Sequence, residues 1–262
     1  MEIPSTLCSN LYDFAFCPEP CYDRLVDLAD PEDWGLNNRI LKNYLSFSFS
    51  RAVFLTERDA NQTAPSNLPL VFDDGRCLFN TGLYTRRYEN IYGLFEPNTK
   101  PDARQHWFLK GFFKESDPML VAFEYLPCRV HFAEDPSELV FDYRLPIRSN
   151  IDHILGDEEN LTRIPTSLMG EDNSLLLRRA FEGAVAESAR RAAANYTLAV
   201  PQFYGGRIQL LLPLCLTSDK PELALTIQRE DGFYAARTCL TIEMAYNNAR
   251  LICRPETSWI KR

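Results

Sequence analysis

At 262 residues, the chain is long enough for one large domain or two small ones with a sizeable core. Apolar residues make up 45% of the chain and aromatic residues 12%, a composition that excludes wholesale disorder. The formal net charge of −8 disfavours a general, non-specific grip on nucleic acid or anionic membranes, but it is compatible with a local basic groove.

No segment of the sequence suits a membrane span or a secretion signal. The longest apolar run, residues 208–216, is too short to cross a bilayer and contains Pro213. The first ten residues lack a basic region followed by an apolar one. We therefore expect a cytoplasmic protein with no membrane contact.

The eight cysteines lie mostly in apolar segments, where cysteine usually behaves as a small buried hydrophobe. Cys17 and Cys21 form the one close pair in the sequence. A zinc site would need a second pair of Cys or His at short spacing, and the sequence has none. We predict reduced thiols and no metal site, and no pattern identifies a cofactor.

The first part of the chain is predicted to be β-rich after an acidic start. Residues 1–35 are expected to form an acidic, solvated lid, and residues 36–149 a β-rich half. A hairpin is predicted around the turn Asp73-Asp74-Gly75, because glycine accepts a positive φ. Residues 38–54 mix helix-like and strand-like spacing, so their type stays open. Further strands are predicted over 91–95, 107–113, 128–132 and 139–143.

The second part, residues 150–262, is predicted to combine a long helix with a strand meander. The helix runs from about 171 to 195, with Asp172 or Asn173 as its cap. Its buried face is predicted to hold Leu177, Phe181, Ala184, Val185, Ser188 and Ala192. Shorter elements are a helix over 150–156, a polar turn over 157–160, strands over 207–216, 223–229 and 233–238, and a final helix over 241–251.

These elements predict a single α+β domain spanning residues 1–262, with mostly antiparallel sheets, one long central helix and a C-terminal meander. The sequence lacks the phosphate-binding, dinucleotide-binding and zinc-protease motifs. Three groups of polar residues remain as candidates for a site.

The first group is Asn80-Thr81-Gly82, directly after the predicted hairpin. Asn80 and Thr81 are candidate ligand-binding residues; the alternative is a plain turn. Basic and aromatic residues then alternate, a pattern typical of single-stranded nucleic-acid binding, unless the cations are merely solvated over buried aromatics. The series is Arg86, Arg87, Lys100, Arg104, Lys110 and Lys114 with Tyr84, Tyr88, Tyr92, Trp107 and Phe108.

The second group surrounds His153, which is the candidate general acid–base because it lies beside several carboxylates. Asn160 is a candidate ligand-binding residue, and Arg163 could clamp a phosphate. The alternative is a structural Arg163–Glu159 pair and a hydrogen-bonded core histidine.

The third group is Tyr246, Asn248 and Arg250 in the final predicted helix, where Asn is a poor helix former. Gln202 and Tyr204 follow the long helix in an extended segment. Because unpartnered buried polar groups are unfavourable, we predict that most candidates converge on one anion-accepting pocket between the long helix and the meander.

Segments carrying a family resemblance occur in order along the chain: LFNTGLY (78–84), HIL and EENLTRIP (153–165), NYTLAVPQFYGGRIQLLLPL (195–214) and FYAARTCLTIEMAYNNARLI (233–252). Together they resemble a bacterial domain family described as of unknown function, over roughly residues 35 to 260. The resemblance places the chain among domains that occur beside RNA-related modules, such as cold-shock and LOTUS-type winged-helix domains. It therefore implies RNA or nucleotide handling in bacterial RNA metabolism.

Three functions are compatible with these patterns. The main hypothesis is a binding domain for RNA or a nucleotide. The first alternative is an enzyme that processes a phosphoester in RNA or a nucleotide, and the second is a domain that binds a protein partner.

Overall fold

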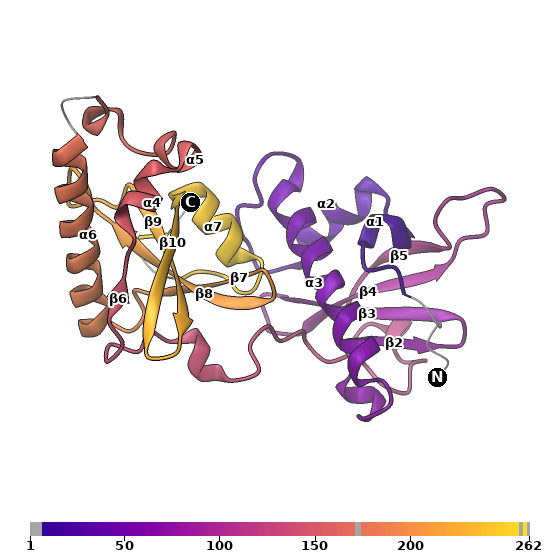
Figure 1. Cartoon of the computed structure of the whole chain (residues 1–262). Coiled ribbons are helices and arrows are strands. Elements are labelled where there is room, and N and C mark those ends of the chain that lie inside the picture. The colour runs from indigo at the N-terminus through magenta and orange to yellow at the C-terminus, as the bar shows by residue number, and fades with distance from the viewer. Residues whose placement is uncertain (1–6, 171–173, 257–258, 261–262) are drawn as a thin grey trace. The chain divides into compact units, whose positions relative to one another are not determined.

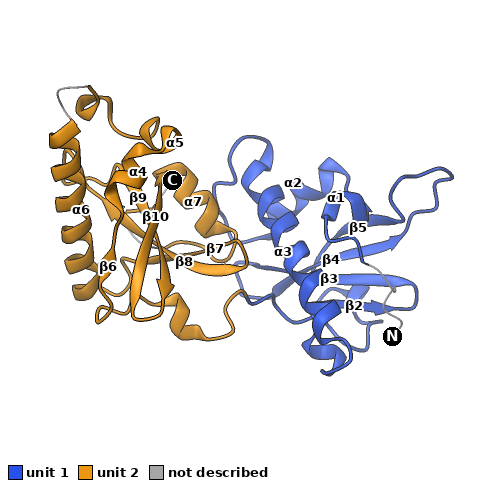
Figure 2. Ribbon diagram, viewed as in Figure 1, with its two compact units in different colours: residues 1–131 blue, residues 132–262 orange. Residues whose placement is uncertain are grey.

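The computed structural model describes residues 7–170, 174–256 and 259–260. The chain divides into two compact units, Met1–His131 and Phe132–Arg262 (Figure 2). The boundary between the two units, after His131, precedes the boundary at residue 149 that the sequence suggested between its two halves. That the chain behaves as a single domain stays a prediction, and each unit is described separately below.

The first unit is built on a five-stranded mixed sheet with the order β1-β5-β4-β3-β2. The strands are β1 (Ala15–Phe16), β2 (Leu70–Asp73), β3 (Arg76–Tyr84), β4 (Asn90–Pro97) and β5 (Trp107–Lys114). β2 to β5 pair antiparallel, and β1 joins β5 in parallel. The hairpin at Asp73-Asp74-Gly75 is confirmed, with Gly75 at φ +68°.

Helices cover this sheet (Figure 1). They are α1 (Leu11–Phe14), α2 (Glu19–Leu28) and α3 (Arg39–Asp59), with short 3-10 turns η1 (Leu36–Asn38), η2 (Pro65–Asn67) and η3 (Pro118–Leu120). α3 packs on β2 and β3, and α2 packs on β5. Fully buried Phe49 of α3 meets Phe79 and Phe95 with ring centroids 5.4 and 5.9 Å apart. The ambiguous segment 38–54 is therefore helical over residues 39–54, and Phe49 belongs to the core, whereas Phe54 is exposed.

Residues 7–35, expected to form a solvated lid, are an integral part of the first unit. They contribute β1 and α2, and Phe14, Tyr22 and Leu25 are buried. The acidic side chains of α1 and α2 lie on helices whose opposite faces are apolar and buried.

The second unit contains another five-stranded mixed sheet, with the order β6-β10-β9-β8-β7. The strands are β6 (Ile147–Arg148), β7 (Val200–Tyr204), β8 (Arg207–Leu214), β9 (Leu223–Glu230) and β10 (Phe233–Thr241). β7 to β10 form an antiparallel meander, and β6 pairs in parallel with Tyr234 and Ala235 of β10. The predicted meander is confirmed, and Pro201 lies inside the edge strand β7.

The helices of the second unit are α4 (Ile151–Gly156), α5 (Glu158–Leu161), α6 (Ser174–Ala194) and α7 (Ile242–Arg250), with 3-10 turns η4 (Pro136–Leu139) and η5 (Thr166–Leu168). α6 packs on β8, whereas α7 packs on β7, β9 and β10. The six residues predicted for the buried face of α6 are its buried residues. Its predicted caps, Asp172 and Asn173, lie outside the described residues.

The α+β class with mostly antiparallel strands is confirmed, but two of its details differ. Two helices, α3 and α6, are 21 residues long, so α6 is not a single central helix. Residues 128–132 and 139–143 form no strands. Val130 and Phe141 are nevertheless buried, so these apolar segments fill the core without joining a ladder.

Candidate functional site

Asn80, Thr81 and Gly82 form an irregularity in β3, where its pairing with β4 shifts between Asn80 and Tyr84. Oδ1 of Asn80 accepts from the Gly82 amide at 2.9 Å, and its Nδ2 donates to the carbonyl of Pro127 at 3.0 Å. The Thr81 hydroxyl donates to the Ile91 carbonyl at 2.6 Å and accepts from the Leu83 amide. The side chains of Asn80 and Thr81, the candidate ligand-binding residues, therefore bond to the protein's own backbone.

Gly82 is required at this irregularity for two reasons. Its φ of +72° is unfavourable for other residues. A Cβ added at Gly82 would lie 2.5 Å from Oη of Tyr44, which donates to the Thr81 carbonyl at 2.9 Å. Asn80, Thr81 and Gly82 therefore stabilise the local backbone, which agrees better with the plain turn than with a ligand site.

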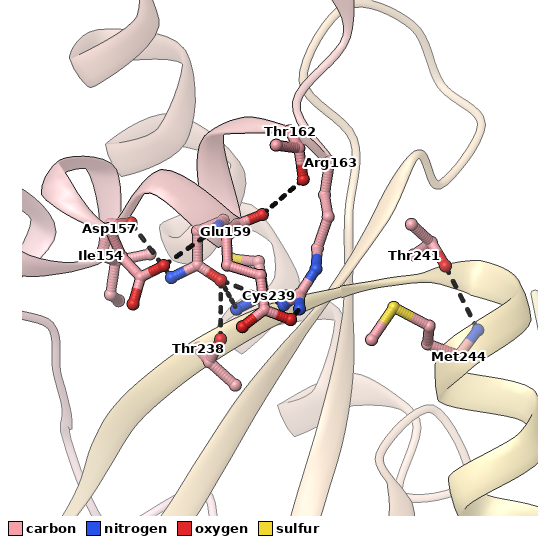
Figure 3. Close-up of polar contacts among 10 residues, drawn as sticks. Ile154, Asp157, Glu159, Thr162, Arg163, Thr238, Cys239, Thr241 and Met244 are labelled. Carbon is pink, nitrogen blue, oxygen red and sulfur yellow. Dashed lines mark hydrogen bonds and ion pairs between the residues drawn. The ribbon is translucent and has the colours of Figure 1, made fainter.

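Asn160 and Arg163 hold the outer edge of β10 beyond its short pairing with β6. Figure 3 shows Arg163 reaching Cys239 of this strand. Oδ1 of Asn160 accepts from the Thr238 hydroxyl at 2.7 Å and the Cys239 amide at 3.3 Å. Arg163 Nη1 donates to the Cys239 carbonyl at 2.5 Å and to Asn160 Oδ1 at 3.2 Å. We call Asn160, Arg163, Thr238 and Cys239 the β10 edge cluster. Its side chains replace the neighbouring strand that β10 lacks there.

The donors of Arg163 are largely committed to this structure. Its Nη2 also pairs with the carboxylate of Glu159, and its side chain is only 10% exposed. Burial raises the pKa of the Cys239 thiol to about 12 despite the opposing effect of the Arg163 charge. Arg163 therefore has the structural pairing that the sequence offered as the alternative to a phosphate clamp.

His153 lies exposed on α4. Its amide donates to the capping Oδ1 of Asn150 at 3.3 Å. Within the described ranges, its imidazole forms no hydrogen bond or ion pair. It is therefore not the hydrogen-bonded core histidine of the alternative interpretation, and no carboxylate orients it for acid–base chemistry.

Gln202 belongs to a row of amide side chains that crosses the second sheet. Asn248 of α7 donates to Gln202 at 3.1 Å, Gln202 donates to Gln209 at 2.9 Å, and Gln209 donates to Gln228 at 3.1 Å. Gln228 then donates to the carboxylate of Glu230 at 2.8 Å, and Arg237 pairs with the same carboxylate. Both ends of the buried Gln202 amide are thus occupied.

The three remaining candidates, Tyr204, Tyr246 and Arg250, also belong to the second unit. Tyr246 and Arg250 are buried in α7, and both take part in further interactions. Tyr204, at the end of β7, is 69% exposed. The structure thus brings together Asn160 with Arg163, and Gln202 with Asn248. Asn80 and Thr81 belong to the first unit.

An open cleft of about 700 Å³ lies beside α6, between it, α4 and η5. The apolar side chains of Leu155, Leu168 and Leu177 line it, and Asp152 pairs with Arg178 at 2.5 Å on its wall. None of the ten predicted site residues is among its described lining residues. Gly170 and Ser174 of the lining flank residues 171–173, which lie outside the described part of the chain.

A different group of polar residues is exposed at the end of the β3–β4 hairpin in the first unit. We call Tyr84, Arg86, Arg87, Tyr88 and Arg129 the hairpin-end cluster. The Tyr84 and Tyr88 ring centroids are 5.8 Å apart, and the Arg129 guanidinium lies 5.8 Å from the Tyr84 ring. Tyr88 is 82% exposed. Four members belong to the predicted basic–aromatic series, whereas Arg129 was missed because it lies beyond the end of that series at Lys114, with no local motif.

Thr85 fixes the loop that carries this cluster. Its amide donates to the Glu89 carbonyl at 2.9 Å, and its carbonyl accepts from the Tyr88 amide at 2.8 Å. Its buried hydroxyl accepts from the amides of Arg87 and Glu89 at 3.2 and 3.3 Å. These bonds hold Tyr88 at φ +61°, an uncommon conformation for a bulky residue. The exposed ring is thus held in place by an ordered loop.

Three cations of the hairpin-end cluster lack anionic partners in the portion of the chain that the structure describes. Arg86 and Arg87 are exposed, Arg129 is half-buried, and none of their guanidinium groups forms an ion pair or hydrogen bond there. The later cations of the series differ. Arg104 pairs with Asp13, Lys110 with Glu96 and Lys114 with Glu89, and Lys100 lies over the Phe16 ring.

The described residues contain no cluster of three or more His, Cys, Asp or Glu side chains placed to hold a metal ion. None of their helices combines the length and apolarity required to cross a membrane.

Comparison with known proteins gives one match. A family model described as "Domain of unknown function (DUF3825)" matches residues 25–259. No curated protein and no solved structure matches the chain.

Proposed function

Since the chain belongs to this family of unknown function, we propose from its geometry that it binds RNA or a nucleotide at the hairpin-end cluster. The observation that carries the proposal is the exposed Tyr88 ring, which lies beside Tyr84 and follows Arg86 and Arg87 in the same loop, while Arg129 lies over the Tyr84 ring. Among the described residues, none of these three guanidinium groups has an ion-pair partner. An aromatic face accepts a base by stacking, and arginine donates to phosphate oxygens in a planar fork.

The local charge supports this proposal against the acidity of the whole chain. Most of the net charge of −8 arises within residues 1–35, which hold eight acidic residues and one arginine, whereas phosphate binding depends on cations within a few ångströms. Among the described residues no carboxylate pairs with these guanidinium groups, so a phosphate has no ion pair to displace there.

The wider biological role is part of the same proposal. The sequence resemblance to a bacterial family that occurs beside RNA-related modules supports a cytoplasmic role in RNA metabolism. The phosphoester-processing alternative has less support, because His153 lacks an orienting partner among the described residues. A protein partner is the expected outcome only if the hairpin-end cluster binds no nucleotide.

Calorimetric titration with uridine and adenosine monophosphates and with a single-stranded hexauridylate tests the proposal. Tyr88→Ala should weaken binding about tenfold or more, because stacking on an aromatic ring contributes about 1–3 kcal/mol per base. Tyr88→Phe should retain binding, since the ring face remains. Arg129→Ala should weaken binding as well.

Tyr204→Ala is the matched control, because Tyr204 is also exposed but lies in the second unit. It should bind like the wild type. Equal losses in the Tyr88→Ala and Tyr204→Ala variants, or no binding of any nucleotide by the wild type, would contradict the proposal.

A further inference from the structure

Resting on the proposed function, we infer that the hairpin-end cluster recognises one nucleotide unit, a single base with its adjoining phosphates. It does not guide a strand along the protein. The sequence pattern over residues 76–114 indicated a longer basic–aromatic track, and three features of the structure shorten it.

The first feature is the pairing of the later cations. The Nη2 of Arg104 lies 2.5 Å from Asp13, and the Nζ atoms of Lys110 and Lys114 lie 3.3 and 3.2 Å from Glu96 and Glu89. Each carboxylate cancels much of the field of its partner, so a phosphate gains little there. Beyond Arg87, the series offers no row of open cations.

The second feature is the acidic chain beside Tyr84. The Asp30 amide donates to the Tyr84 carbonyl at 2.8 Å, so this segment runs next to the cluster. Residues 27–33 contain four acidic residues and no basic one. A polyanion continuing over this segment would meet acidic side chains and no basic one.

The third feature is the spacing of the two tyrosine rings. Their centroids are 5.8 Å apart with a tilt of 42°. A base inserted between two rings needs about 7 Å, twice a contact distance of ~3.5 Å. The pair therefore accepts a base on the outer face of Tyr88 and not between its members. One platform takes one base.

The cations match this footprint. Arg129 lies against Tyr84, and Arg86 and Arg87 precede Tyr88 in the loop. Contact with the two phosphates that adjoin one base gives a salt dependence of about −1.4 in log K against log salt, from about −0.7 per phosphate for single strands. A strand-tracking groove would give a steeper slope.

Oligouridylates of one, two, three, six and twelve nucleotides test the inference by calorimetry at several salt concentrations. Affinity should reach a plateau by three nucleotides, and the twelve-mer should bind within about threefold of the three-mer after correction for the number of binding registers. An Arg104→Ala, Lys110→Ala double variant should bind the twelve-mer like the wild type.

The outcomes separate the two proposals. Tightening of tenfold or more from three to twelve nucleotides, or a loss of twelve-mer affinity in the double variant, would show a track and overturn the single-unit footprint while leaving the proposed function intact. Failure of every length to bind would overturn the proposed function and this inference with it.

Discussion

The β10 edge cluster and the hairpin-end cluster both contain arginine, and they differ in what the guanidinium groups contact. In the β10 edge cluster, Asn160 and Arg163 direct their amide and guanidinium groups at the backbone of Cys239. In the hairpin-end cluster, the guanidinium groups of Arg86 and Arg87 donate to no acceptor among the described residues, and Tyr88 is exposed on an ordered loop. Polar residues therefore stabilise the fold in the β10 edge cluster and form a candidate binding surface in the hairpin-end cluster.

This difference gives a criterion for the other candidates. The side chains of four of them form hydrogen bonds within their own units: Asn80, Thr81, Gln202 and Asn248. Such residues should affect stability when changed, and ligand binding only indirectly. Residues of the hairpin-end cluster should show the opposite pattern.

The largest expected effect is the destabilisation of the second unit by Asn160→Ala. The change removes the acceptor for the Cys239 amide and the Thr238 hydroxyl, and should lower the free energy of unfolding by about 3 kcal/mol. Urea unfolding followed by circular dichroism measures it. Glu158→Ala, exposed on the same helix, is the control and should remain within about 0.5 kcal/mol. An unchanged midpoint for Asn160→Ala would remove the structural half of the comparison.

A smaller loss of stability is expected at the β3 irregularity. Gly82→Ala should cost about 2 kcal/mol, because its Cβ would clash with Oη of Tyr44 in addition to the backbone strain. Gly75→Ala is the matched control: its φ is +68° with no atom within 4 Å, so only about 1 kcal/mol of backbone strain applies. Adding Tyr44→Phe to Gly82→Ala should recover part of the difference. Equal costs at the two glycines would show that the close approach is unimportant.

The opposite sign is expected at Tyr88. Asparagine tolerates a positive φ better than tyrosine, so Tyr88→Asn should raise the free energy of unfolding by up to about 1 kcal/mol. The same variant should lose nucleotide affinity, because the stacking ring is gone. Parallel urea and calorimetric titrations measure both effects. Destabilisation with unchanged binding would place Tyr88 among the structural residues.

The smallest expected effect concerns Asp142, before β6. Hydrogen bonds from the Arg144 side chain and amide lower the pKa of Asp142 to about 2 from its ordinary value of 3.8. Because the folded-state pKa is depressed, the stabilisation is present above the ordinary value and is lost as pH falls toward 2. The urea midpoint of Asp142→Asn should therefore lie below that of the wild type at pH 7, and the two should converge between pH 4 and pH 2. A pH-independent difference would exclude the carboxylate charge as its source.

The sequence could predict features whose signal is local and periodic. The buried face of α6 was predicted correctly because its residues recur with the helical period. The turn at Gly75 and the meander followed from short-range turn chemistry in the same way. The strand predictions for residues 128–132 and 139–143 were wrong, because a short apolar run is equally suited to a strand and to irregular chain packed into a core.

The candidate site depended on contacts that sequence spacing does not contain. Arg163 meets the Cys239 carbonyl 76 residues along the chain, so no local pattern separates a strand-edge partner from a phosphate ligand. Arg129 is comparable, since only the fold brings it to Tyr84. The basic–aromatic series was a sound indication of where exposed cations lie, but the pairing of Arg104, Lys110 and Lys114 with distant carboxylates was hidden.

The hydrogen bonds of Asn160 and Arg163 to the backbone of Cys239 also have a consequence for solubility. A strand edge with open amide and carbonyl groups can recruit an edge from another molecule and so begin aggregation. Asn160 and Arg163 occupy this amide and carbonyl with groups that cannot propagate a sheet. Variants that loosen α5 would uncover a pairing edge flanked by apolar Leu240, and their first defect at high concentration would be self-association of the folded protein.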